Sequence, residues 1–472
     1  MPTILAIAVL LLLLLLCSVR LATGRPTTQE PLVSGKKWAM HEQDNRTCNA
    51  GSRTFTGTVN VATGKTLSFW FVESRQAPED RPVLVWLSGG PGASSLIGLF
   101  AEIGPCTLDR DDTQTSLNPD SWSNHANLLF VDQPAGVGFS TIDDESLMPG
   151  ELDDASPDFS TLMSTFFTLM FPQYASNGVI FAGESHGGRY VPRYVYDIAR
   201  AKRTTLGQHL LPFEVLGIIL VDALVGAKYQ TTSQYDLFCT DSPSSEYLRF
   251  NESVCEAMAA ATPECERLFE LCEVTLDPYS CKAAGDFCDN EVGKYFTAEY
   301  MSGRRSPYDG TNPGGGSLNT YLNKPEIQKL LGFERPVNYS DINYALNEKW
   351  TRNPIITVPS TSEVVHLLDK ENANVLVLNG QFDVADNVPG TVRFYDGLGW
   401  HGQAGYRARN LEEWYWKDSF GEVRKGGTRK GFRNLQFFSI NGAGHQSPGD
   451  QKGAVRSVFE RWLADIQKRT IR

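Results

Sequence analysis

The 472-residue chain lacks an excess of positive charge, a heptad pattern and internal repeats. Its 55 Asp and Glu residues outnumber its 43 Lys and Arg residues, which gives a formal net charge of −12. Phosphate groups would repel such a chain, so nucleic acid and anionic membrane surfaces are not expected partners. The CxxC pairs of common zinc sites are missing as well, and no cofactor motif occurs. We therefore expect neither a metal nor a cofactor.

A hydrophobic run long enough to span a membrane is also missing. Residues 3–17 are apolar and uncharged, but a span needs roughly 20 such residues. The run fits the apolar segment of a signal peptide, and Ala22, Thr23 and Gly24 offer small residues for cleavage. We expect residues 1–24 to be a signal peptide, without stable membrane association afterwards. Because no basic residue precedes the run, a short signal anchor is the alternative.

The cysteines agree with a secreted protein. Loss of Cys17 with the signal peptide leaves eight, and the last six crowd between Cys239 and Cys288. An even set in an oxidising compartment indicates disulfides. Sequons at Asn45, Asn251 and Asn338 permit N-glycosylation. We expect the secretory pathway, ending outside the cell or in a vacuolar or lysosomal lumen.

Apolar runs of strand length alternate with segments of helical periodicity. The runs that predict buried strands are residues 82–88, 128–134, 179–182, 213–225, 374–379 and 435–440, and residues 55–74 predict a hairpin. Buried strands that alternate with helices predict an α/β fold with a mostly parallel sheet covered on both faces. The pattern breaks down between Gly226 and Asn353, where the clustered cysteines lie. We expect a core formed by residues 25–225 and 354–472, with an inserted cap at residues 226–353.

A candidate nucleophile follows the strand predicted near residue 180. Gly183-Glu184-Ser185-His186-Gly187 matches GxSxG, and helical spacing follows it. This strand–turn–helix setting is typical of a nucleophile elbow, whose sharp turn exposes the serine hydroxyl. The alternative is a glycine-rich turn with an incidental serine.

A nucleophilic serine needs a base, and the base needs an orienting acid. Asp383 and His445 each come just after a predicted strand, so both are expected at the carboxyl edge of the sheet. His366 and His401 are also far enough along the chain, but neither directly follows a predicted strand. The sequence therefore predicts a catalytic triad of Ser185, Asp383 and His445.

Glycines after the strand at residues 82–88 suggest where an oxyanion would be stabilised. Ser88-Gly89-Gly90-Pro91-Gly92 lets backbone N–H groups approach a substrate. We expect the N–H groups of Gly90 and His186 to donate to the oxyanion. The alternative is that the glycines only form a turn.

These residues resemble the serine carboxypeptidases of the carboxypeptidase Y type. The resemblance covers nearly all of the mature chain, and its blocks are WLSGGPGASS (86–95), NLLFVDQPAGVGFS (127–140), GESHGGRYVP (183–192), YLNKPEIQKLL (321–331) and GAGHQSPGDQ (442–451). It implies an α/β-hydrolase fold with an inserted cap. It also implies hydrolysis of the last bond of peptides and proteins through an acyl-enzyme on Ser185.

The resemblance further implies how the free carboxylate of the substrate is held. Ser88 and Gly89 would bind it together with two acids, Glu102 and Glu184. Two close carboxylates cannot both ionise readily, so one keeps a proton near acidic pH and can donate a hydrogen bond to the substrate carboxylate. We therefore expect the best activity at acidic pH.

The family's cap also implies a disulfide pattern for this chain. The spacing of the clustered cysteines matches nested bridges Cys265–Cys288 and Cys272–Cys281, with Cys239–Cys255 beside them. Cys48 is then left to pair with Cys106.

The chain departs from the family pattern at several positions. It has Ser88 for the usual Asn, Ala93 for Cys, His186 for Tyr, Gln446-Ser447 for Met-Val, and Val221-Asp222-Ala223 for Gly-Asn-Gly.

Other functions are compatible with the same residues. An acyltransferase or an esterase on this scaffold would use the same triad and differ in what it cleaves or in what attacks the acyl-enzyme. A non-catalytic secreted binding protein would normally show a broken triad, and this triad is intact. The glycine block and the two acids favour a serine carboxypeptidase.

Overall fold

The computed structural model describes residues 37–246, 248–296, 317–333 and 336–470. The expected signal peptide, residues 1–24, lies outside the described residues. Across those ranges, no helix combines the length and the apolar character that crossing a membrane requires.

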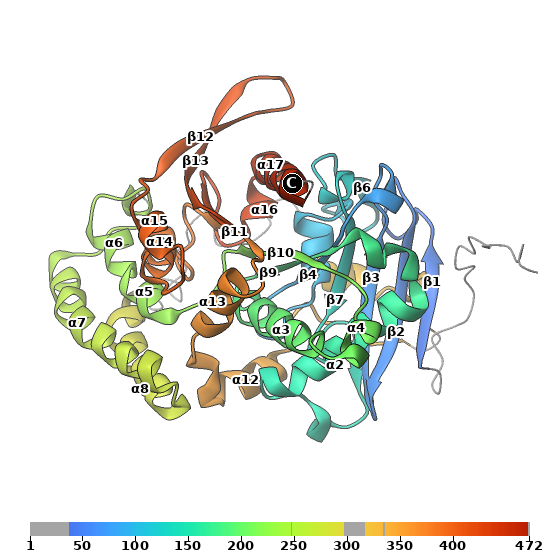
Figure 1. Ribbon diagram of the computed structural model, residues 1–472, viewed down its shortest axis with the longest axis horizontal. Coiled ribbons are helices and arrows are strands. Elements are labelled where there is room, and N and C mark those ends of the chain that lie inside the picture. The colour runs from blue at the N-terminus through green and yellow to red at the C-terminus, as the bar shows by residue number, and fades with distance from the viewer. Residues whose placement is uncertain (1–36, 247, 297–316, 334–335, 471–472) are drawn as a thin grey trace, which may run out of the picture.

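A twelve-stranded sheet runs through the centre of the molecule (Figure 1). From one edge to the other its strands are β1 (Trp38–Gln43), β2 (Thr54–Ala62), β3 (Lys65–Val72), β7 (Asn127–Asp132), β4 (Val83–Leu87), β9 (Val179–Glu184), β10 (Val215–Val221), β11 (Asn374–Gly380), β14 (Leu435–Ile440), β13 (Val423–Phe432) and β12 (Glu412–Lys417). The short strand β8 (Thr141–Ile142) pairs with β3, and β5 (Cys106–Leu108) pairs with β6 (Thr115–Leu117) in a separate sheet. The central strands from β7 to β14 are parallel, and the flanking pairs are antiparallel.

The predicted α/β architecture with a mostly parallel central sheet is confirmed. Each predicted buried strand corresponds to a central strand, and the predicted hairpin is formed by β2 and β3 around Gly64, whose φ is +71°. The edge strands β1 and β12, and the neighbouring β13, were not among the predicted elements.

Helices cover both faces of the sheet, as parallel strands require. The helices are α2 (Leu152–Thr165), α3 (Gly187–Ala201), α4 (Thr205–Leu210), α5 (Ala227–Thr232), α6 (Gln234–Cys239), α7 (Glu252–Thr275), α8 (Pro278–Cys288), α10 (Leu318–Leu322), α11 (Pro325–Leu330), α12 (Tyr344–Arg352), α13 (Thr361–Asp369), α14 (Val388–Gly397), α15 (Gln403–Arg407), α16 (Ser447–Asp450) and α17 (Lys452–Thr470). Side chains of α2, α3 and α13 pack on one face, and those of α17 pack on the other.

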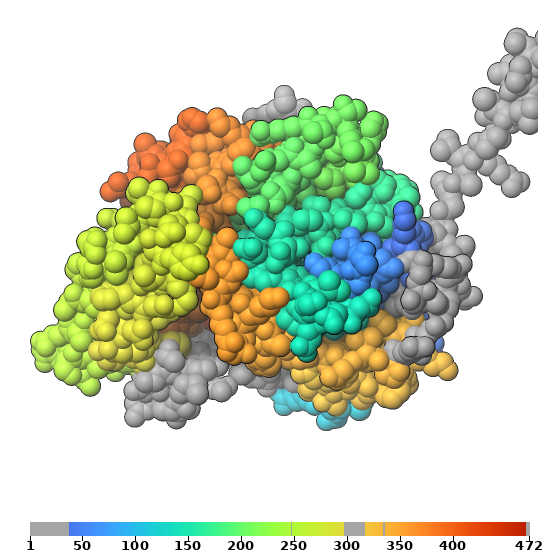
Figure 2. Space-filling model, turned by 90° about the horizontal axis from the view of Figure 1, so that it is seen from below, coloured from blue at the N-terminus to red at the C-terminus, as the bar shows by residue number. Residues whose placement is uncertain are grey.

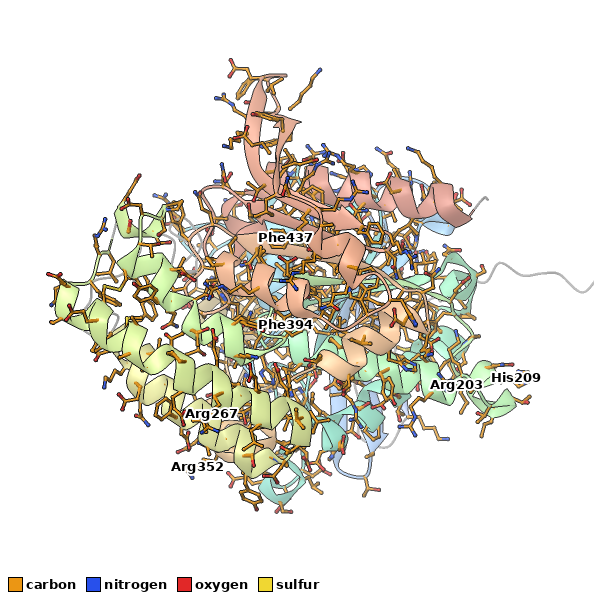
Figure 3. The ribbon with its side chains drawn as sticks, turned by 60° about the vertical axis from the view of Figure 1, so that its left-hand side comes forward. Arg203, His209, Arg267, Arg352, Phe394 and Phe437 are labelled. Atoms are coloured by element: carbon orange, nitrogen blue, oxygen red, sulfur yellow. A yellow bond between two sulfur atoms is a disulfide. The ribbon has the colours of Figure 1, made fainter. Side chains whose placement is uncertain are left out.

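Strand β4 shows why its whole sequence is apolar. Val83, Val85 and Leu87 point into the core on one face, whereas Leu84 and Trp86 point into the core on the other. Because successive side chains alternate between faces, a strand buried on both sides must be apolar at every position. The cores are visible in Figure 3, where Phe394 of α14 and Phe437 of β14 lie inside the fold.

A helical hairpin of α7 and α8 lies outside the sheet, between β10 and β11 in the chain. It stands to the side of the sheet in Figure 1, and Figure 2 shows it as a separate yellow-green body beside the orange segment that follows it. Its buried interior consists of Phe269, Ala284 and the cysteines of two disulfides, Cys265–Cys288 and Cys272–Cys281. A third disulfide, Cys239–Cys255, ties α6 to α7.

The helices α10, α11 and α12 follow this hairpin in the chain but pack against the sheet. Tyr321, Leu322 and Ile327 join the core on one face, and Leu346 and Trp350 join the core on the other. The boundary expected for the cap, residues 226–353, therefore includes a segment that contributes to the core.

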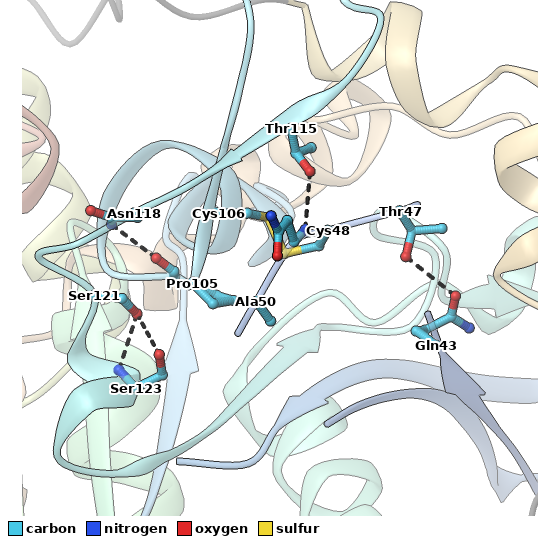
Figure 4. Close-up of a disulfide and its surroundings, with 12 residues drawn as sticks. Gln43, Thr47, Cys48, Ala50, Pro105, Cys106, Thr115, Asn118, Ser121 and Ser123 are labelled. Atoms are coloured by element: carbon cyan, nitrogen blue, oxygen red, sulfur yellow. Dashed lines mark hydrogen bonds between the residues drawn. A yellow bond between two sulfur atoms is a disulfide. The ribbon is translucent and has the colours of Figure 1, made fainter. Parts of the chain in front are cut away.

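The fourth disulfide, Cys48–Cys106, joins the loop after β1 to β5 (Figure 4). Beside it, the N–H of Asn49 donates to the Thr115 hydroxyl at 3.1 Å. The four pairs are those that the resemblance implies.

Candidate active site

Ser185 lies in a tight turn between β9, which ends at Glu184, and α3, which begins at Gly187. Its φ is +57°, in the left-handed region that a residue with a side chain seldom adopts. The turn is held to the end of β10, because the Ser185 N–H donates to the carbonyl oxygens of Val221 and Asp222 at 3.0 and 3.1 Å. The backbone conformation is therefore that of a nucleophile elbow.

Close packing around the elbow explains its glycines. A Cβ on Gly183 would lie 2.6 Å from the carbonyl oxygen of Gly187, and a Cβ on Gly89 would lie 2.4 Å from the backbone N of His186. Real Cβ atoms do not approach this closely, so neither position accepts a side chain without rearrangement. The loop after β4 is therefore pressed directly against the elbow.

Asp383 and His445 come together from two different loops. Asp383 follows β11 and is buried, and His445 follows β14 with a side chain that is 31% exposed. His445 Nδ1 and Asp383 Oδ2 are 3.0 Å apart. Burial opposes a charge on the imidazole. The charge and hydrogen bond of Asp383, together with the charges of Asp386 and Asp222, outweigh burial and raise the pKa of His445 above its usual value.

Asp386 lies next to this pair and contacts Asp383. Its N–H donates to Asp383 Oδ1 at 3.1 Å, and burial followed by the charge of Asp383 raises the pKa of the Asp386 carboxyl to about 8. Asp383, Asp386 and His445 form the one group of potential metal ligands within the described residues. The hydrogen bond between His445 and Asp383 accounts for this proximity without an ion.

Two backbone N–H groups, one in the elbow and one in the loop pressed against it, have no hydrogen-bond acceptor among the described residues. Neither the N–H of Gly90 nor that of His186 donates to another described residue. Gly90 has a φ of +103°, a conformation that glycine adopts readily. Free N–H groups beside a nucleophile can stabilise an oxyanion.

The side chain of His186 is separate from this chemistry. It is buried, and its ring packs edge-on against Tyr190 and Trp350, with centroids 5.1 and 5.8 Å away. Burial lowers the pKa of His186 to about 3, so this imidazole stays neutral. A pKa this low makes the His186 imidazole a weak base. His186 is therefore not poised to compete with His445 as a base near neutral pH.

Glu102 and Glu184 form a buried acidic pair, 1% and 5% exposed. Burial raises the pKa of Glu102 to about 7, against the opposing positive charge of Lys452. Burial and then the charge of Glu102 raise the pKa of Glu184 well above its usual value. Both oxygens of Glu102 and Oε1 of Glu184 are buried and accept no well-formed hydrogen bond from the described residues. Such unsatisfied polar atoms in a folded protein are typical of a binding or catalytic site.

Ser88 is buried at the end of β4 and already has two partners. Its N–H donates to Ser95 Oγ at 3.1 Å, and its hydroxyl oxygen accepts from the Trp86 indole at 3.2 Å. The hydroxyl hydrogen is still available for one donated bond.

Asp222 also lies at this site, although its sequence pattern predicts no role for it. It is fully buried, directly after β10, and it influences the pKa values of both Glu184 and His445. A charged residue at the end of an apolar strand was the one signal that could have pointed to it.

Comparisons with known proteins support this picture. Residues 45–465 match the family described as serine carboxypeptidase. Two similar curated proteins, from different fungi, are each named carboxypeptidase Y homolog A. The protein from Talaromyces marneffei is 31% identical over 408 residues, which is 84% of this chain and 70% of that one. The protein from Aspergillus niger is 30% identical over 459 residues, which is 93% of this chain and 78% of that one.

Among solved structures, the fold is similar to that of Kex1(delta)p, a prohormone-processing carboxypeptidase from Saccharomyces cerevisiae. The TM-score is 0.69, and the match covers 88% of this chain and 92% of that chain. With 22% sequence identity, this likeness supports the fold alone.

Proposed function

Because the chain belongs to the serine carboxypeptidase family, we propose that Ser185, Asp383 and His445 are the residues that carry out its hydrolysis of peptides. The single observation that supports this most strongly is the 3.0 Å contact between His445 Nδ1 and Asp383 Oδ2, at the same sheet edge as the strained Ser185 turn. Asp383 fixes the imidazole tautomer that leaves Nε2 free to act as the base.

The reaction proceeds in two halves. Ser185 Oγ attacks the carbonyl carbon of the last peptide bond while His445 Nε2 accepts the hydroxyl proton. The N–H groups of Gly90 and His186 donate to the oxyanion that forms. His445 then gives the proton to the departing amine, so the C-terminal amino acid leaves and the acyl-enzyme remains. Water attacks this ester as His445 takes a proton from it, and the return of that proton to Ser185 Oγ releases the shortened peptide.

Glu102 and Glu184 give the enzyme its preference for a free C-terminus. A protonated carboxyl in this pair donates a hydrogen bond to the carboxylate of the substrate, and the Ser88 hydroxyl and the Gly89 N–H add further donors. The raised pKa of Glu102, about 7, supports a proton on the pair at acidic pH. Activity on peptides is then best in acid, because the proton is lost as the pH rises.

Replacement of the nucleophile tests the triad. Ser185→Ala is expected to abolish hydrolysis of blocked dipeptides while the circular dichroism spectrum stays unchanged. The matched control is Ser176→Ala, because Ser176 is an exposed serine in a turn away from the sheet edge. A phosphonate inhibitor should label Ser185 in the control and label nothing in Ser185→Ala. Turnover by Ser185→Ala would contradict the assignment.

Blocked dipeptides and their C-terminal amides, compared by mass spectrometry, distinguish a carboxypeptidase from a general esterase or amidase. A requirement for the free carboxylate predicts that the acids are cleaved much faster. An added amino-acid amide or alcohol tests acyl transfer, because an acyltransferase would give the transfer product in preference to the acid.

The four disulfides are consistent with a protein of the secretory pathway. We further infer a cleaved signal peptide, release to the exterior or to a vacuolar or lysosomal lumen, and glycans at Asn45, Asn251 and Asn338. All three asparagines are exposed, which supports modification. N-terminal sequencing of the mature protein and its mass before and after glycosidase treatment test these inferences.

A further inference from the structure

Asp222 occupies an unfavourable position for an acidic residue. It is 0% exposed and has a φ of +44°, so a side chain that prefers water is buried on a strained backbone. Among the described residues, no Lys or Arg forms an ion pair with it. Such a combination persists only where many surrounding contacts hold it in place.

The contacts of Asp222 reach three segments of the chain. Its Oδ1 accepts from the N–H of Gly380 at 2.5 Å and from the side chain of Asn379 at 3.1 Å. Its Oδ2 accepts from the N–H of Ser447 at 3.1 Å. Its backbone carbonyl accepts from the Ser185 N–H at 3.1 Å, and its own N–H donates to the carbonyl of Leu378 at 2.9 Å.

These segments are the ones that present the triad. Gly380 ends β11 and its carbonyl accepts from the Asp383 N–H at 3.2 Å. Ser447 begins α16 and lies two residues after His445. Asp222 therefore has direct hydrogen bonds to the nucleophile, to the strand that carries the acid and to the loop that carries the base.

We propose that Asp222 is a positioning residue that holds Ser185, Asp383 and His445 in register with one another. Its carbonyl fixes the nucleophile, and each oxygen of its carboxylate fixes one of the other two segments. This proposal rests on the triad assigned above. It predicts that damage to Asp222 acts on the chemical step, because the reacting groups shift relative to one another while the substrate is still bound.

The donors around Asp222 in this chain favour a carboxylate, although the family pattern has Asn at this position. Three N–H groups point at its two oxygens, and an amide would have to place its own NH₂ group against at least one of them. If the oxygen of an asparagine stays on Gly380 and Asn379, its NH₂ group meets the N–H of Ser447. Asparagine therefore keeps the link to the acid and loses the link to the loop of His445, whereas alanine loses both.

Charged groups face Asp222 from each neighbouring segment. Asp383 lies after β11, His445 lies after β14, and Glu184 ends β9. Burial and the charge of Asp383 raise the pKa of Asp222 well above its usual value, whereas His445 and the three N–H donors favour the ionised form.

Three variants and one control test the proposal in the full-length mature enzyme. Asn379→Ala removes one of the three donors, Asp222→Asn removes the acceptor of the Ser447 N–H, and Asp222→Ala removes the acceptors of all three. The control is Asp158→Asn, which breaks another buried acid's contact, the 3.1 Å ion pair with Lys65 on the flank of the fold. Circular dichroism and thermal unfolding establish that each protein is folded.

The expected result is a graded loss of kcat with KM changed by less than about twofold. A displacement of about 1 Å at a catalytic group costs on the order of a hundredfold, so we expect about tenfold for Asp222→Asn and about a hundredfold for Asp222→Ala. Asn379→Ala should lose less than either, and Asp158→Asn should keep the kcat of the wild type even if its melting temperature falls. Phosphonylation of Ser185 should slow in the same order.

A spectroscopic measurement separates positioning from general loss of stability. The low-field proton resonance of the hydrogen bond between His445 Nδ1 and Asp383 should shift or broaden in both Asp222 variants and stay unchanged in Asp158→Asn. If folded Asp222→Asn keeps the wild-type kcat and resonance, or raises KM alone, the proposal is wrong. If Asp222→Asn does not fold, the proposal is decided by Asn379→Ala, whose unchanged kcat and resonance would overturn it. Failure of the triad itself would appear separately, as turnover by Ser185→Ala.

Discussion

Replacement of Glu102 by glutamine tests how the enzyme recognises a free C-terminus. A carboxyl with a pKa of about 7 is almost fully protonated at pH 5, and about a tenth protonated at pH 8. If the Glu102 carboxyl itself is the donor to the substrate, this donor is lost about tenfold for each pH unit above 7, and kcat/KM for peptides carries that factor. Glutamine donates from its NH₂ group at every pH. Glu102→Gln should therefore exceed the wild type on peptides by about tenfold at pH 8.

The assay is the pH profile of kcat/KM for a blocked dipeptide and for the matched ester or amide without a free carboxylate. His445 must be deprotonated to act on either substrate. The wild type should therefore lose peptide activity above pH 7 relative to its activity on the uncharged substrate. Glu102→Gln should flatten only the peptide profile. The matched control is Glu145→Gln, because Glu145 is an exposed glutamate in a short turn, and its profiles should equal those of the wild type.

Two results would refute this reasoning. If the peptide and uncharged substrates give the same profile in the wild type, loss of a proton from the pair does not limit recognition of the carboxylate. If Glu102→Gln loses peptide activity at pH 5 as well as at pH 8, Glu102 binds in some way that an amide cannot reproduce. The first result would also favour an esterase.

Three further predictions concern stability. The folded state binds the Glu102 proton more tightly than the unfolded chain does. Ionisation of this carboxyl therefore lowers the free energy of unfolding by about 3 kcal/mol as the pH rises from 4.5 to about 7. Urea titrations across this range should show a smaller fall for Glu102→Gln than for the wild type. Replacing Cys272 and Cys281 together by serine should cost about 2–4 kcal/mol of cap stability, measured as earlier opening of α7 and α8 in hydrogen exchange, while the sheet keeps its protection. Phe159→Ala should cost about 3–5 kcal/mol in the same titrations, because the ring is fully buried and stacks on Tyr194 at 4.7 Å; a cost below 1 kcal/mol would contradict the packing described for α2.

The central strands could be predicted because burial on both faces makes them apolar throughout. β4 and β11 have this pattern, and their predicted and observed bounds agree within a residue. The antiparallel strands β12 and β13 carry charged side chains on exposed positions, so their sequence has no apolar run to detect. β13 pairs with β14 and β12 pairs with β13, and local sequence does not reveal this pairing.

Asp383 and His445 could be anticipated because a parallel sheet brings the ends of its strands to one edge. The role proposed for Asp222 could not, because it depends on which backbone N–H groups meet one carboxylate across β10, β11 and α16. Similarly, α12 follows the clustered cysteines and was expected in the cap, but Trp350 packs in the core beneath the sheet. Such contacts are a product of the tertiary fold rather than of periodicity or spacing.

The nested disulfides of the α7–α8 hairpin have a consequence for exposure of the chain to other peptidases. The turn at Leu276 and Asp277 is exposed, and it lies inside both the Cys272–Cys281 and the Cys265–Cys288 loops. A cut there would divide the polypeptide in two without separating the pieces, since two covalent links still cross the break. The clipped protein would migrate as one species on a denaturing gel without reductant and as two species with it, and the cap would stay attached to the working enzyme.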